Sequence, residues 1–468
     1  MKLSHYNNIG IALLSLCFLG CTKFVAVNPP TTELVTASVF NNSATATSAQ
    51  LAIYSKMYAN NESPNLAIQT GFLGDELTNY NTSSSYVQLY TNSMTASQVP
   101  GPWVDAYNYI YQANAIISAL QNSQSISSQI QQQLLGESKF VRAFWFFYLT
   151  NLYGDIPLVT STNYSVNDTI VPTSKAQVYS QIIIDLKDAQ NLLSSNYVDA
   201  SDTAITKDRT RPTKWAATAL LARVYLYIKD YVDAEAQASA VINNTALYGL
   251  CSNLNNVFLA NSSEAIWQLG IPLPSSYNTM DGYDFILISA PSVCSVAPQL
   301  LNSFEAGDSR RVNWVDSFKT TTAPIKNYYY PYKYKVRSSS TITEYVMVLR
   351  LAEQYLIRAE ARLLQGNAGG SVIDLNTIRL RANLQAYSGG NDQQSLLTAI
   401  LHERQVELFT EWGNRWLDLS RTGSIDSVMS IVAPSKGGTW NADGHQALYP
   451  IPQSEISLDV NLTQNPGY

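Results

Sequence analysis

The sequence predicts a mostly α-helical protein with tetratricopeptide-like helix pairs, one long irregular segment and little β-structure. Apolar residues recur at helical spacing over most of the chain. Residues 212–243 read as two helices around a turn at Asp230-Tyr231, with small residues where the helices would touch, and residues 350–380 repeat this pattern. Residues 250–342 are instead rich in Gly, Pro, Ser and Tyr, and helical periodicity is hard to find in them.

The same spacing predicts the other helices of the scaffold. They are expected at residues 44–58, 103–120, 126–153, 175–193, 393–411 and 412–421. The third of these ends at a Gly-Asp-Ile-Pro turn, and its run Phe144-Trp145-Phe146-Phe147 is expected to lie in the core.

We therefore expect a helical scaffold at about 40–250 and 343–431, with an irregular subdomain at about 250–342 between its two parts. Residues 74–102 resemble that subdomain in composition, and residues 432–468 read as a loop-rich tail. Within the subdomain, tyrosines and lysines alternate at residues 328–335, which predicts a short strand.

The composition points to a neutral surface rich in hydrogen-bonding groups. Only 14% of the 468 residues are charged, whereas 46% are hydrophobic and the chain holds 30 Tyr and 8 Trp. The formal net charge of -6 excludes the basic surface of a nucleic-acid-binding protein. Sugars suit such a surface, because their C–H faces stack on aromatic rings and their hydroxyls need neutral partners.

The start of the chain reads as a signal peptide at residues 1–20. Lys2 precedes an apolar run, Ile9–Leu19, that is too short to span a membrane. The ending Phe18-Leu19-Gly20-Cys21 resembles the bacterial lipobox, which predicts lipidation of Cys21 and anchoring to a membrane. The alternative is an ordinary secretory signal. Cys17 is the poorer candidate, because Leu16 would occupy the cleavage position.

Besides Cys21, two cysteines follow this signal. Cys251 and Cys294 are expected as isolated thiols, and a disulfide between them is the alternative.

Motifs for catalysis and metal binding are missing from the sequence. His402-Glu403 begins like a zinc-protease helix, but Val406 stands where the second histidine is needed, and neither a Walker loop nor a nucleophile elbow is present. We predict no catalytic residue, metal or cofactor. Carboxylates for glycoside hydrolysis remain an open alternative. They are Asp281, Asp284, Glu305 and Asp308.

A charged helical turn is expected to serve structure. Glu403, Arg404 and Glu407 lie on one turn, with Arg404 and Glu407 as an i,i+3 pair. A catalytic acid with an arginine clamp is the functional alternative, but an ion-pair network is favoured. Glu137 and Arg142 are interpreted in the same way.

Several short motifs, in this order along the chain, resemble a known family. They include Gly136–Ala143 followed by Leu152–Leu158, Ala219–Leu226, Leu401–Arg404 with Glu407-Leu408, Arg415–Leu419, Tyr449–Pro452 and the final Leu462–Tyr468. With them, the chain resembles from end to end the SusD/RagB family of outer-membrane nutrient-binding lipoproteins of Bacteroidetes-type bacteria. The segment after Cys21 departs from many members in not being acidic.

The resemblance implies a superhelical scaffold that carries an irregular ligand-binding part. It implies binding of a glycan without hydrolysis, and delivery to a SusC-type TonB-dependent transporter in the outer membrane. The lipid anchor would hold the protein in that membrane, facing the cell exterior. The alternatives are a peptide or amino-acid importer component, a surface glycosidase, and a scaffold that binds only the transporter.

Candidate ligand contacts are aromatic residues of the irregular segments. The first group is Tyr80, Tyr86 and Tyr90, beside Asn79 and Asn81, and the second is Tyr277, Tyr283, Phe285 and Trp314. A denser cluster of Tyr328, Tyr329, Tyr330, Tyr332 and Tyr334 partly packs on the scaffold in our interpretation. Asp75 and Glu76 are assigned either to sugar hydroxyls or to structural capping.

Overall fold

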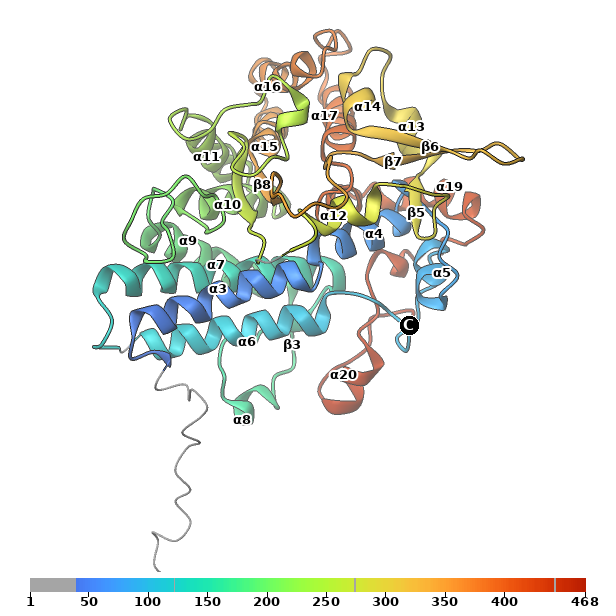
Figure 1. Ribbon diagram of the computed structural model, residues 1–468. Helices are drawn as coiled ribbons and strands as arrows, with labels where there is room; N and C mark the ends of the chain where they lie inside the picture. The colour runs from blue at the N-terminus through green and yellow to red at the C-terminus, as the bar shows by residue number, and fades with distance from the viewer. Residues whose placement is uncertain (1–38, 122, 273–274, 442) are drawn as a thin grey trace, which may run out of the picture.

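A computed structural model describes residues 39–121, 123–272, 275–441 and 443–468, and it confirms a mostly helical fold (Figure 1). The predicted signal peptide and Cys21 lie outside the described residues. None of the described helices is long and apolar enough to cross a membrane.

The longer helices form the scaffold. They are α3 (Ser43–Ala59), α4 (Glu62–Leu73), α6 (Trp103–Leu120), α7 (Ser128–Tyr153), α9 (Lys175–Leu192), α10 (Lys214–Tyr227), α11 (Tyr231–Ile242), α15 (Leu351–Leu364), α16 (Ala368–Arg381), α17 (Gln393–Leu408), α18 (Asn414–Thr422) and α19 (Ile425–Ser435). Shorter helices lie mainly in the irregular parts. They are α5 (Ser84–Tyr90), α8 (Tyr164–Asn167), α12 (Met280–Phe285), α13 (Pro298–Ser303), α14 (Ser309–Asn313), α20 (Gln453–Leu458) and the 3-10 turns η2 (Leu254–Asn256) and η3 (His445–Ala447).

The scaffold helices pack in a continuous series. Helix α7 lies between α6 and α9, α10 packs on α9 and α11, and α15 packs on α11, α16 and α17 (Figure 1). The predicted pairs at 212–243 and 350–380 are α10 with α11 and α15 with α16. Thr213 caps α10 and Asp230 caps α11, so short polar residues set both starts.

The β-structure consists of four antiparallel two-stranded pairs in the described residues. The pairs are β1 (Leu77–Asn79) with β5 (Cys294–Val296), β2 (Ile156–Pro157) with β3 (Pro172–Thr173), β4 (Ala265–Leu269) with β8 (Val346–Arg350), and β6 (Val315–Lys319) with β7 (Asn327–Pro331). Strand β7 confirms only the first part of the strand predicted at residues 328–335, because it ends at Pro331. The pairing of β1 with β5 brings together two irregular segments that lie far apart in the sequence.

The core is centred on α7. Phe144, Trp145, Phe146 and Phe147 are each fully buried, which confirms their predicted place in the core. The ring of Trp267 from β4 contacts the rings of Tyr54, Phe140 and Phe144. The β4–β8 pair is therefore packed directly onto the scaffold.

The predicted ion-pair network is confirmed, but its partners are not the adjacent residues. Glu407 is bound by Arg310, Arg350 and Arg381, while Glu403 is bound by Arg310. The expected pair of Arg404 with Glu407 is wrong: Arg404 instead binds Asp418 on α18, with 2.7 Å between Nε and Oδ2. Each helical carboxylate faces a neighbouring element rather than its own helix.

The second charged pair behaves in the same way. Arg142 binds Asp185 of α9, and Glu137 accepts hydrogen bonds from Tyr54 and Arg211. Both groups connect α7 to its neighbours, so their structural interpretation is confirmed.

Both described cysteines are free. Cys294 is buried and Cys251 is half-buried, as expected for isolated thiols.

Candidate ligand-binding surface

Helix α12 is held in place on its buried side by two polar residues, Thr279 and Asp281. Thr279 Oγ1 accepts a hydrogen bond from the Gly282 backbone N–H at 3.0 Å and so caps the helix. Asp281 Oδ1 accepts a hydrogen bond from Ser63 Oγ of α4 at 2.8 Å. These contacts anchor the buried side of α12 and leave Tyr283 and Asp284 on its outer side, where both are half-buried.

A glycine lets the next segment approach this helix closely. A Cβ added at Gly282 would lie 2.5 Å from the carbonyl oxygen of Val336, a distance that real Cβ atoms essentially never show. Because the two backbones nearly touch, the following residue, Arg337, lies over the ring of Tyr283. Its guanidinium carbon is 4.2 Å from the ring centroid.

Tyr277 completes this group. Its ring centroid lies 4.5 Å from that of Tyr283, in an edge-to-face arrangement. The carbonyl of Ser276 accepts hydrogen bonds from Ser339 N–H at 3.0 Å and from Ser338 Oγ at 3.1 Å. These hydrogen bonds tie the segment that carries Tyr277 to the segment that carries Arg337.

The first predicted group lies on α5 and at the end of β1. Tyr86 and Tyr90, one helical turn apart, both stand edge-on to the ring of Phe72, with centroids 5.7 and 6.0 Å away. The ring of Tyr80 lies 5.6 Å from that of Tyr328 on β7. The structure thus brings the first predicted group beside the predicted tyrosine cluster, through the β1–β5 pair.

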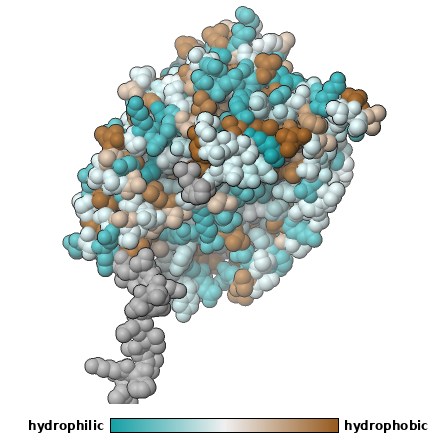
Figure 2. All heavy atoms as spheres, in the orientation of Figure 1, coloured by the Kyte–Doolittle hydropathy of each residue, from teal (hydrophilic) through white to brown (hydrophobic). Residues whose placement is uncertain are grey.

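Asp284, next to Tyr283 on α12, acts electrostatically on both groups. Burial raises the pKa of its carboxyl to about 6, although the neighbouring Arg337 lowers it. Burial also raises the pKa of the Tyr86 hydroxyl, and the charge of Asp284 raises it further. We call the region the aromatic surface, made of Tyr80, Tyr86, Tyr90, Tyr277, Tyr283 and Tyr328 with Asp284 and Arg337. In Figure 2 hydrophobic atoms gather near the position of α12 and β5, among polar residues.

Two of the predicted contacts are corrected by the structure. Trp314 is fully buried, and its Nε1 donates a hydrogen bond to the carbonyl of Leu254 at 3.1 Å. Phe285 is only 4% exposed and points from α12 into the core of the protein. It lies four residues after the inward-facing Asp281, so helical spacing was the available signal for its burial. These two rings belong to the core.

Asp75 and Glu76 have structural partners. Arg415 donates to both oxygens of Asp75, at 2.9 and 2.7 Å. Glu76 accepts a hydrogen bond from the Thr410 backbone N–H at 3.3 Å, and burial raises the pKa of its carboxyl to about 8. Of the two roles predicted for this pair, the structure favours the structural one.

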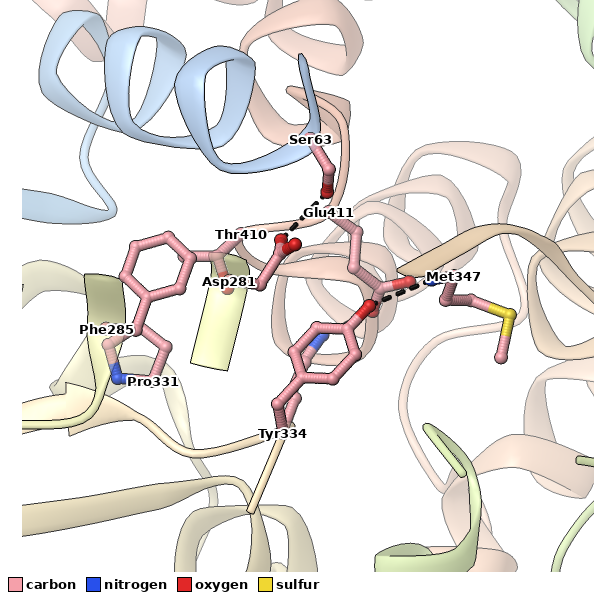
Figure 3. A pocket seen from close by; sticks show the side chains of 9 residues that line it. Ser63, Asp281, Phe285, Pro331, Tyr334, Met347, Thr410 and Glu411 are labelled. Carbon is pink, nitrogen blue, oxygen red and sulfur yellow. Dashed lines mark hydrogen bonds and ion pairs between the residues drawn. The ribbon is translucent and has the colours of Figure 1, made fainter. Parts of the chain in front are cut away.

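A small, largely enclosed cavity lies beneath α12 (Figure 3). Its lining includes Ser63, Asp281, Tyr334, Met347 and Glu411. Its volume is about 10 Å³, which is room for about one water molecule. The cavity is too small for a sugar, and it lies behind the aromatic surface.

The carboxylates considered for hydrolysis do not form a catalytic pair at this surface. Glu305 is bound by Arg379 and Asp308 by Arg310, while Asp281 is buried. Of the four, only Asp284 belongs to the aromatic surface, whereas glycoside hydrolysis uses two opposed carboxyls. Across the described residues, no cluster of His, Cys, Asp and Glu could hold a metal ion.

Comparisons with known proteins identify the family. Residues 307–468 match the sequence model described as the SusD family, and residues 24–226 match one described as starch-binding proteins associating with the outer membrane. The chain belongs to the SusD family. The resemblance in the sequence motifs is thereby confirmed.

Relatives within the SusD family cover most of the chain. SusD-like protein P2 of Formosa agariphila is 29% identical over 424 residues, which are 78% of this chain and 80% of that protein. Starch-binding protein SusD of Bacteroides thetaiotaomicron is 24% identical, over 71% of this chain and 72% of that protein.

Solved structures agree with the predicted fold class. A SusD homolog from Bacteroides thetaiotaomicron superposes with a TM-score of 0.79 at 21% identity, covering 93% of this chain and 99% of that one. Surface glycan-binding protein A from Bacteroides fluxus gives 0.72 at 21% identity, covering 94% and 100%. At these identities the likeness establishes the fold.

Two larger hollows of this SusD-family protein lie among other residues. One of about 240 Å³ is lined by Trp103, Tyr107 and residues of α20, and one of about 260 Å³ lies beside α3 and is lined by Asp208 and Tyr345. Neither contains a residue that the sequence singled out as a ligand contact.

Proposed function

We propose that this protein is a lipid-anchored, non-enzymatic component of a nutrient import system, which binds a glycan at the cell surface. The aromatic surface carries the proposal. The β1–β5 pair joins two segments about 200 residues apart, and the ring of Tyr80 contacts that of Tyr328 while Tyr277 contacts Tyr283. Half-buried rings at the surface fit an extended oligosaccharide better than a closed pocket would.

The chemistry of this surface matches that of a sugar. Tyrosine rings contribute apolar faces for the C–H groups of a pyranose, and their hydroxyls can hydrogen-bond to its rim. The side-chain amide of Asn79 donates a hydrogen bond to the Asn81 carbonyl and accepts one from the Asn81 N–H, which holds the turn beside Tyr80 in one conformation. Rings that are already positioned lose little conformational entropy on binding.

Delivery to a transporter is the second half of the proposal. The lipobox-like ending at Cys21 and the family description as outer-membrane-associated support an anchored protein. We infer that its partner is a SusC-type TonB-dependent transporter, and that the glycan passes to it intact.

Binding assays with a panel of oligosaccharides and peptides test this function. We expect Tyr283→Ala to cost about 1–3 kcal/mol of glycan affinity by titration calorimetry, as for aromatic residues at the centre of an interface. Tyr164→Ala is the matched control, because that ring is 80% exposed on α8, which contributes no residue to the aromatic surface.

Other outcomes would contradict the proposal. Equal affinity in both variants, or a glycan seated in the hollow beside Tyr345 in a soaked crystal, would exclude the aromatic surface. Turnover of a glycan that Asp284→Asn abolishes would identify a glycosidase. Binding of peptides alone would identify a peptide importer, and transporter association without any soluble ligand would identify a scaffold.

A further inference from the structure

Arg337 stands out among the arginines near the aromatic surface because no carboxylate is bonded to it. In the part of the chain that the structure describes, its side chain forms no ion pair within 4.0 Å and no hydrogen bond. Its Nε is buried without a partner. The half-buried guanidinium rests on the ring of Tyr283. By contrast, Arg415 and Arg350 each bind carboxylates in the same half of the molecule.

A partly desolvated cation whose N–H groups have no bonded partner is costly, so its position needs a reason. The stack on Tyr283 compensates only part of that cost. The charge of Asp284 acts on Arg337. The two described side chains nevertheless form no ion pair within 4.0 Å, so Asp284 leaves the N–H groups of Arg337 unbonded. The structure therefore keeps a cation beside tyrosine rings, with N–H groups left over for another molecule.

We propose that the aromatic surface binds an acidic saccharide, and that Arg337 pairs with its carboxylate or sulfate group. This inference rests on the proposed function and specifies its ligand class. A planar guanidinium can donate two parallel N–H bonds to either group, which a lysine cannot do. The uncharged part of the saccharide lies along the neighbouring rings, beginning with Tyr277.

Because the whole protein is negatively charged, its affinity for an acidic saccharide depends on the contact with Arg337. The net charge of -6 gives no general attraction for anions, so the affinity must come from a local partner. Local pairing of this kind weakens with added salt at an open surface. Salt dependence thus separates an acidic ligand from a neutral one.

Titration calorimetry of the full-length protein in detergent tests the inference with three probes of equal length. They are oligogalacturonides, which carry carboxylates, carrageenan oligosaccharides, which carry sulfates, and neutral malto-oligosaccharides. We expect at least one acidic probe to bind about tenfold or more tightly than the neutral one. The probe that binds best distinguishes carboxylate from sulfate.

Variants then assign the contact. Arg337→Gln should lower affinity for the acidic probe by about tenfold or more and leave any neutral binding unchanged, while Arg337→Lys should lie between. Arg311→Gln is the matched control. Its guanidinium also stacks on a tyrosine, Tyr329 at 4.7 Å, but that ring packs on the core side of β7, opposite Tyr328.

The results distinguish this inference from the function on which it rests. Neutral binding as tight as acidic binding, with no effect of Arg337→Gln, would overturn the acidic ligand and keep the glycan-binding function. Failure of every saccharide to bind would overturn both. If Arg337→Gln does not fold, Arg337→Lys and the salt dependence of the wild type decide. The inference is contradicted if the affinity for the acidic probe is the same in Arg337→Lys as in the wild type, or if added salt leaves it unchanged.

Discussion

At the scale of single residues, burial controls the protonation of several carboxyls. Glu62 begins α4, is 5% exposed, and accepts a hydrogen bond from the Tyr109 hydroxyl at 2.8 Å. Burial raises the pKa of this carboxyl to about 8, from 4.5. Between these pH values the folded protein holds a proton that the unfolded chain has lost, so the free energy of unfolding falls as pH rises.

Glu62→Gln should remove this pH dependence, because the amide keeps the hydrogen bond from Tyr109 and carries no charge. Relative to the wild type, we expect the variant to gain stability from pH 5 to pH 9. The gain in the free energy of unfolding is at most about 1.4 kcal/mol for each unit by which the pKa of Glu62 is shifted. Urea unfolding at several pH values measures it. Glu455→Gln on α20 is the control, and a constant difference between Glu62→Gln and the wild type would contradict the assignment.

Residue types predicted the site only in part. Tyr80, Tyr277 and Tyr283 could be chosen because aromatic residues in irregular segments are candidates for binding. Trp314 satisfied the same rule, yet its place in the core depends on contacts with Phe258 and Phe409 that no local pattern reveals. Arg337 was missed, because its stacking follows from the close approach at Gly282.

At the scale of elements, most of the longer helices were predictable from the spacing of apolar residues, but α4 was not. The spacing of apolar residues predicted α6, α9 and the pairs α10–α11 and α15–α16 close to their observed bounds. Helix α4 was not predicted. Apart from Asn65, all of its residues are buried, so its sequence lacks the polar stripe that marks an amphipathic helix.

The position of α12 depends on one missing side chain. In Gly282→Ala the new Cβ would meet the carbonyl oxygen of Val336, a backbone atom that cannot rotate away. We expect the variant to lose about 1–3 kcal/mol of stability despite the better helix propensity of alanine. It should also lose glycan affinity, because Tyr283 and Arg337 move apart. Urea unfolding and calorimetry measure the two effects.

Gly249→Ala is the control for this change, since a Cβ there would have no atom within 4 Å. Equal stability and affinity of both variants would show that α12 does not depend on the close contact.

At the scale of the whole molecule, charges bind the irregular part to the scaffold. Arg310 of α14 reaches Glu403 and Glu407 of α17, and Lys333, two residues after β7, binds Glu411. Removing one partner from such a buried pair typically costs about 3–5 kcal/mol. The network, together with the β1–β5 pair, explains why the loops that carry the aromatic surface hold a defined position. These long-range partners could not be predicted from the sequence, although the charged turn itself could.

The proposed membrane anchoring of the whole molecule depends on a lipid at Cys21. The neighbouring Cys17 provides the control for testing it. A thioether-linked lipid at Cys21 would place the protein in the detergent phase of a Triton X-114 extract and allow labelling with palmitate. Cys21→Ser should lose the label and should no longer enter the detergent phase, because a single hydroxyl cannot form the thioether. Cys17→Ser should keep both properties, since Leu16 does not suit cleavage before residue 17. Label retained in Cys21→Ser would contradict lipidation at this residue and would assign the lipid to another residue.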